Sequence, residues 1–156
     1  MKVNKKKVLK TMLGTLVFFI LINICWYAWR IDKYGIYNKG MEENDFSTWL
    51  VPRYEYTDVN GYDYIVQYPD YFQFTGHLCV FSTKDNDMLS DTLIIWLRLF
   101  DGYDYDVFLS EGDESFFIDI NANGSAVYPE ESEIVVRNQK DIDDLLSKAK
   151  EMWNLE

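Results

Sequence analysis

The chain has 156 residues, 48% of them apolar and 17% aromatic, with a net charge of −11 at pH 7. This length suffices for one folded domain plus an additional segment, and the apolar content makes a hydrophobic core feasible. The acidic balance disfavours nucleic acid as a partner, because no basic stripe is present to neutralise phosphates.

The N-terminal segment predicts a membrane anchor. Residues 1–10 carry five lysines and no acid, and residues 11–29 carry no charge at all. Nineteen helical residues span about 28 Å, close to the ~30 Å hydrocarbon core of a bilayer. Trp26, Tyr27 and Trp29 lie at the far end of this run, where amphipathic rings favour the membrane interface. We therefore expect an uncleaved transmembrane helix, a signal anchor, at 11–29.

A cleaved signal peptide is the alternative, and it would leave a secreted domain. Signal peptides have an apolar core of about 7–15 residues, followed by small residues at the cleavage site. The apolar run is longer here, and Ala28 is the only small residue near its end. These flanks favour the anchor.

The lysines also predict orientation, because the basic side of a membrane helix stays in the cytoplasm. Residues 1–10 are then cytoplasmic, the helix 11–29 crosses a bacterial cell membrane, and the residues after it lie outside the cytoplasm. We expect a stalk at 30–47, where two glycines interrupt any long period, and an extracytoplasmic domain at 48–156. All 26 acids follow residue 29 with ten Lys/Arg, a balance of −16, which suits cations or a basic partner.

Two cysteines are present, one in the predicted span (Cys25) and one in the outer domain (Cys79). They cannot meet across this topology, so the outer domain has no internal disulfide and depends on its core for stability.

Alternation of apolar and polar residues predicts a β-meander in the outer domain. The run 92–100 is the most hydrophobic stretch outside the predicted span, and its β-branched and aromatic residues favour a central strand. A polar turn is expected at 84–91. Together the apolar and alternating segments predict about five or six antiparallel strands: 62–68, 77–82, 92–100, 102–110, 115–120 and 125–128.

The end of the chain changes to a helical period, which predicts an amphipathic helix at 139–154. Asn138 is the expected N-cap, and residues 130–137 fit either a short helix or another strand. An apolar stripe needs a sheet to cover, so the fold class is α+β. The stripe consists of Ile142, Leu145, Leu146, Ala149, Met152 and Trp153.

The string DINANGSAVYPE at 119–130 fits the calcium-loop pattern D-x-[DN]-x-[DN]-G-x5-E at every fixed position. The preceding residues alternate like a strand rather than a helix, and Gly124 equally suits the left-handed position of a hairpin turn. A plain hairpin turn and a weak calcium site therefore both remain open. The predicted ligands are Asp119, Asn121, Asn123, the Ser125 carbonyl and Glu130.

Six tyrosines fall within eighteen residues. Tyrosine is enriched at recognition surfaces, so they are a candidate contact surface, although aromatic residues also suit half-buried strands. The set is Tyr54, Tyr56, Tyr62, Tyr64, Tyr68 and Tyr71.

No catalytic constellation emerges. The only histidine, His77, lies two positions from Cys79, but no third orienting group accompanies them. The near-repeat GYDYIV (61–66) and GYDYDV (102–107) fits either a duplication or chance. We expect a non-enzymatic, single-pass membrane protein that needs no cofactor, with calcium as the alternative, and that binds another envelope protein or component.

Overall fold

The computed structural model describes residues 5–82 and 90–155. The first four residues, most of the polar turn predicted at 84–91 and the last residue lie outside these ranges. The chain forms two compact units, Met1–Ile36 and Tyr37–Glu156.

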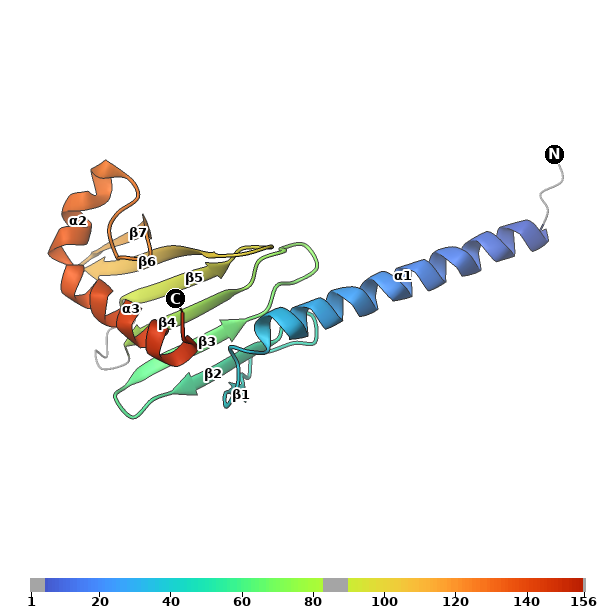
Figure 1. Ribbon diagram of the computed structural model, residues 1–156, viewed down its shortest axis with the longest axis horizontal. Helices are drawn as coiled ribbons and strands as arrows, with labels where there is room; N and C mark the ends of the chain where they lie inside the picture. The colour runs from blue at the N-terminus through green and yellow to red at the C-terminus, as the bar shows by residue number, and fades with distance from the viewer. Residues whose placement is uncertain (1–4, 83–89, 156) are drawn as a thin grey trace. The chain divides into compact units, whose positions relative to one another are not determined.

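The first unit is the helix α1 (Lys5–Tyr34), which is long and apolar enough to cross a bilayer (Figure 1). It includes the predicted span 11–29 and extends beyond both its ends. Its polar side chains bond to carbonyls one turn earlier: Thr15 Oγ1 donates to the Thr11 carbonyl at 3.1 Å, and Asn23 Nδ2 donates to the Phe19 carbonyl at 2.8 Å. These bonds satisfy polar groups that hydrocarbon would leave without partners.

The second unit is built on a seven-stranded antiparallel sheet in which each strand lies beside its neighbour in the chain (Figure 1). The predicted α+β class is confirmed, but the sheet has seven strands rather than five or six. The strands are β1 (Glu42–Glu43), β2 (Arg53–Thr57), β3 (Tyr62–Gln67), β4 (His77–Ser82), β5 (Thr92–Leu97), β6 (Tyr103–Glu111) and β7 (Glu114–Ile120).

Two differences in the strands have local causes. Residues 30–47, the expected stalk, are divided between the end of α1 and the second unit, because Glu42 and Glu43 pair with Glu55 and Tyr54 of β2. The strand expected at 125–128 is reduced to one bridge, between Ile120 and Ala126. The chain turns away there because Pro129 opens a short helix, η1 (Pro129–Glu131), which leads into α2 (Ser132–Arg137).

The predicted C-terminal helix is confirmed as α3 (Gln139–Trp153), which packs against β4 and β5 (Figure 1). Asn138 occupies the predicted N-cap position of α3. The Asn138 side chain makes no cap hydrogen bond; its amide nitrogen donates to Glu111 Oε1 at 2.6 Å and to the Ile134 carbonyl at 3.0 Å.

The core lies between α3 and one face of the sheet. Because strand side chains alternate between faces, every second residue of β3–β7 points toward the helix. The buried residues of this layer include Val66, Leu78, Val80, Leu93, Ile95, Val107, Ile118, Ile142, Leu145, Leu146 and Ala149.

Candidate functional site

The other face of the sheet is not covered by α3, and we call it the open face. Strand register places its side chains in cross-strand rows. One row runs through Arg53, Gln67, His77, Trp96 and Asp104; the next runs through Glu55, Ile65, Cys79, Ile94, Asp106 and Asp119.

A groove of about 510 Å³ lies on the open face over β5, β6 and β7. Its wall combines the indole of Trp96 with three carboxylates, from Asp104, Asp106 and Asp119, and with the guanidinium of Arg98. An indole beside several carboxylates offers both a flat apolar surface and hydrogen-bond acceptors. The groove is therefore the candidate functional site.

Asp106 and Asp119 lie opposite each other on β6 and β7. The Trp96 indole Nε1 donates to Asp106 Oδ2 at 2.6 Å. Burial raises the pKa of Asp106, and although the Trp96 hydrogen bond lowers it, a hydrogen bond and the negative charge of Asp119 raise it again. The net direction of the Asp106 pKa is upward, because burial and the adjacent Asp119 carboxylate both disfavour its ionised form.

This shift predicts a pH-dependent effect of Asp106→Asn. A pKa raised above 3.8 means that the folded chain holds the proton longer than the unfolded chain, so stability falls as pH rises through that window. Asparagine keeps the acceptor for Trp96 without the charge. We expect the variant to be more stable than the parent at pH 7, by up to about 1 kcal/mol. This difference in unfolding free energy should shrink toward pH 3. Urea unfolding of the full chain measures it.

Asp104→Asn is the matched control, because the hydrogen bond from Arg98 lowers the pKa of Asp104. A lowered pKa stabilises the folded state above the unfolded pKa, and this stability is lost as pH falls. Asp104→Asn is therefore expected to be less stable than the parent at pH 7. If both variants differed from the parent in unfolding free energy with the same sign and the same pH dependence, the upward shift of the Asp106 pKa would be contradicted.

Arg98 and Asp104 form an ion pair at 2.5 Å, and both side chains are more than half exposed. Such exposed pairs contribute little to stability. The pair neutralises one of the three carboxylates, so Asp106 and Asp119 supply the remaining negative charge of the groove.

His77 and Cys79 neighbour the groove on the open face but have the properties of core residues. The His77 ring meets the Trp96 ring edge-on, with centroids 4.9 Å apart. Burial, together with the charge of Arg53, lowers the pKa of His77 to about 4. Burial raises the pKa of Cys79 to about 12 despite the nearby Arg53. A neutral imidazole and a protonated thiol do not form an activated nucleophile–base pair.

The DINANGSAVYPE segment forms a tight turn that leaves a strand rather than a helix. Asp119 is the penultimate residue of β7 and faces Asp106. The Asn121 side-chain oxygen accepts the backbone N–H groups of Asn123 at 2.9 Å and Ser125 at 3.2 Å. The Gly124 N–H donates to the Asn121 carbonyl at 2.9 Å. The turn therefore satisfies its own polar groups locally.

Helix α3 binds the carbonyls of this turn. Gln139 Nε2 donates to the Gly124 carbonyl and Lys150 Nζ donates to the Ala122 carbonyl, both at 3.3 Å. Glu130 belongs to η1 instead. Within residues 5–82 and 90–155, no group of three or more His, Cys, Asp or Glu residues is arranged to hold a metal ion. Calcium binding by the predicted set of Asp119, Asn121, Asn123, Ser125 and Glu130 stays a prediction.

The six predicted tyrosines are spread over several environments. Tyr62 and Tyr64 of β3 are buried under α3, where the Tyr62 hydroxyl donates to Asp144 and the Tyr64 ring meets Trp153 edge-on at 5.7 Å. The Asp144 hydrogen bond, burial and nearby carboxylates raise the pKa of Tyr62 to about 12. Of the others, Tyr68 is buried, Tyr54 and Tyr71 are half-buried, and Tyr56 is exposed.

Three of the six tyrosines, Tyr62, Tyr64 and Tyr68, are buried, so a tyrosine contact surface stays a prediction for the other three. Trp96, Asp106 and Asp119 were not grouped from the sequence, because they lie on three different strands. The sequence signal that could have indicated them is an acidic residue inside an otherwise apolar strand segment, as Asp119 is in SFFIDI.

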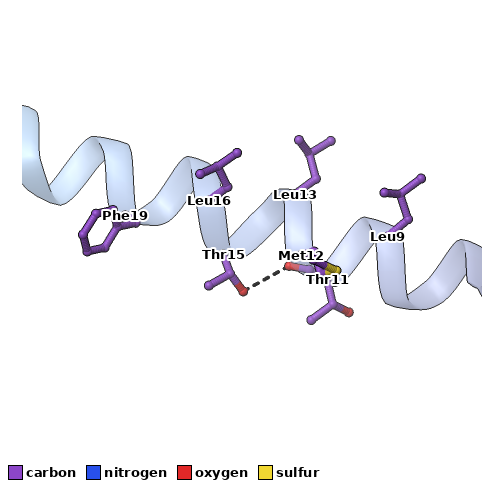
Figure 2. Close-up of a pocket in the computed structure, with 7 residues that line it drawn as sticks. All are labelled: Leu9, Thr11, Met12, Leu13, Thr15, Leu16 and Phe19. Carbon is purple, nitrogen blue, oxygen red and sulfur yellow. Dashed lines mark hydrogen bonds between the residues drawn. The ribbon is translucent and has the colours of Figure 1, made fainter.

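A second, apolar hollow lies on α1 and is lined by Leu9, Thr11, Met12, Leu13, Thr15, Leu16 and Phe19. Figure 2 shows that all seven side chains come from this single helix, with no wall from another element. The hollow is the space between neighbouring side chains on an apolar helix surface and is not a binding cavity.

Comparisons with protein-family models, with curated proteins and with solved structures find no match for this chain.

Proposed function

We propose that this chain is a single-pass membrane protein whose acidic outer domain binds a basic component of the cell envelope, without catalysis. Its N-terminus lies in the cytoplasm, and α1 spans the cell membrane. The observation that carries the binding proposal is the groove of the open face, where Trp96 lies beside Asp106 and Asp119.

The membrane part rests on α1 and on the charges that flank it. Five lysines precede the uncharged run 11–29, and a basic flank favours the cytoplasmic side. The helix meets the length and apolarity that a bilayer requires.

The groove suits an ammonium or guanidinium group. Carboxylates accept strong, charge-assisted hydrogen bonds from such groups, and the face of an indole attracts cations. The balance of −16 after residue 29 raises the local concentration of a basic partner and speeds its association. These terms act together on a lysine or arginine side chain of another envelope protein.

The same residues argue against catalysis. Glycosidases hold their two carboxyl groups far enough apart to admit a sugar ring or a water, whereas Asp106 and Asp119 are direct cross-strand neighbours, and the charge of Asp119 raises the pKa of Asp106. The histidine and cysteine beside the groove are neutral at pH 7, as their pKa values of about 4 and about 12 indicate.

The test is titration of the full chain in nanodiscs with an arginine-containing tripeptide, monitored by calorimetry at low and physiological salt. We expect saturable binding that weakens with salt. Asp119→Asn removes a charged acceptor worth about 1.5–3 kcal/mol, so affinity should fall roughly tenfold or more.

Asp113→Asn is the control, because it makes the same charge change at an exposed position in the β6–β7 turn, away from the groove. It should bind the peptide within about twofold of the parent, a difference below 0.5 kcal/mol. Equal losses in Asp119→Asn and Asp113→Asn would show non-specific attraction and would refute the groove as the site.

A further inference from the structure

Three connections of the sheet leave from the same end. The paired row Arg53, Gln67, His77, Trp96 and Asp104 marks this end of β2–β6. The connections 44–52, 68–76 and 98–102 each begin or end beside that row. They therefore form one surface of the Tyr37–Glu156 unit.

These connections expose large apolar side chains. The exposed fractions are 80% for Phe46, 75% for Trp49, 92% for Phe72 and 93% for Phe100. Phe74 and Leu99 in the same connections are also exposed. We call these six residues the loop-tip cluster.

The loops that carry the cluster are held by hydrogen bonds. In the first, Ser47 N–H donates to the Asn44 carbonyl at 2.8 Å. In the second, the Asp70 side chain accepts the N–H groups of Phe72 and Gln73, both at 2.6 Å. In the third, Arg98 N–H donates to the Gly102 carbonyl at 3.1 Å. The apolar rings are therefore presented by ordered backbone.

The opposite end of the sheet provides the contrast. Its described turns, 58–61 and 112–113, expose one large apolar side chain, Val59. Single exposed apolar residues are normal, whereas a group of them on adjacent loops marks an interaction surface.

Chain length indicates the occupant of this surface. The uncharged run ends at residue 29 and the outer unit begins at Tyr37, so about eight residues tether the domain, at most ~28 Å when extended. With α1 in the bilayer, a tether of this length keeps the bilayer surface within reach of the domain. Tryptophan and phenylalanine on exposed loops favour the interface between headgroups and acyl chains.

We propose that the loop-tip cluster inserts into the outer interface of the bilayer that α1 spans. The three connections also carry Asp45, Asp70 and Asp101, and these carboxylates favour zwitterionic headgroups over anionic ones. The cluster thus gives the outer domain a second membrane contact and a fixed orientation. This inference rests on the membrane anchoring proposed above.

The test uses the full chain with Cys25→Ser in phosphatidylcholine nanodiscs, with one nitroxide label at a time at Phe72→Cys or Phe100→Cys. Cys79 is buried, and the unsubstituted Cys25→Ser chain verifies that it remains unlabelled. The readout is the ratio of collisions with oxygen, which concentrates in the bilayer, to collisions with a water-soluble nickel chelate.

Labels at 72 and 100 should give a ratio severalfold higher than a label at Val59→Cys, at the opposite end of the sheet. A label at Leu16→Cys reports insertion of α1 itself. If position 16 lies in the bilayer while 72 and 100 match 59, the loop-tip proposal is overturned and the anchoring stands. If position 16 is also aqueous, both are overturned.

Discussion

Replacing Ile142 with alanine is expected to destabilise the outer domain by about 2–5 kcal/mol. Ile142 is fully buried at the N-terminal end of the α3 stripe, and its Cγ2 lies next to Gly124 of the turn after β7. Truncation leaves a cavity where helix, sheet and turn meet, and the well-packed surroundings close it only in part. Urea unfolding of the full chain in micelles, followed by tryptophan fluorescence, measures the loss.

Lys140→Ala is the control for this prediction, since Lys140 is on the exposed side of the same helix. It should change the unfolding free energy by less than about 0.5 kcal/mol. Equal effects of Ile142→Ala and Lys140→Ala would mean that α3 is not packed on the sheet as described.

The elements with a clear period were predictable from the sequence. The stripe from Ile142 to Trp153 repeats at helical spacing over about three turns, and a helix is the structure that buries such a pattern on one face. The strand β4 was predicted with its observed ends, His77 and Ser82, because an apolar run of this length between polar segments suits a buried strand.

The edge strands were not predictable in the same way. β1 consists of Glu42 and Glu43, both exposed, and charged residues are what edge strands use to discourage further pairing. Such residues carry no apolar alternation. Pairing with β2 is therefore decided by the tertiary structure rather than by local pattern.

The GYDY near-repeat has a local physical explanation. Gly61 and Gly102 both have positive φ, 79° and 88°, and each directly precedes a strand. The tyrosines that follow both glycines point to the α3 side of the sheet. The same turn requirement followed by the same strand alternation is sufficient to produce the similarity.

The candidate site could not be assembled from the sequence because it depends on register. Asp106 and Asp119 are thirteen positions apart and become opposite neighbours only through the pairing of β6 with β7. A shift of one residue would move either side chain to the other face of the sheet. The identity of the polar residues was visible, but their meeting beside Trp96 was not.

Replacing Gly124 with alanine is expected to cost about 2–5 kcal/mol. Gly124 has φ +76°, and an added Cβ would lie 3.0 Å from Leu146 Cδ1, 3.1 Å from Gln139 Nε2 and 3.2 Å from Ile142 Cγ2. The left-handed backbone costs an alanine about 1–2 kcal/mol, and pressing extra volume against α3 costs about 1–3 kcal/mol. The same urea unfolding measures the sum.

Gly112→Ala separates the two costs. Gly112 also has positive φ, +63°, but an added Cβ there meets nothing within 4 Å. This variant should lose only the backbone part, about 1–2 kcal/mol, so the difference between the two variants reports the packing of the turn on α3. A turn that served only to place metal ligands would need the glycine conformation but not the close helix, and the two substitutions would then cost the same. A larger loss for Gly124→Ala would instead show that the glycine of DINANGSAVYPE is required because α3 packs directly on the turn.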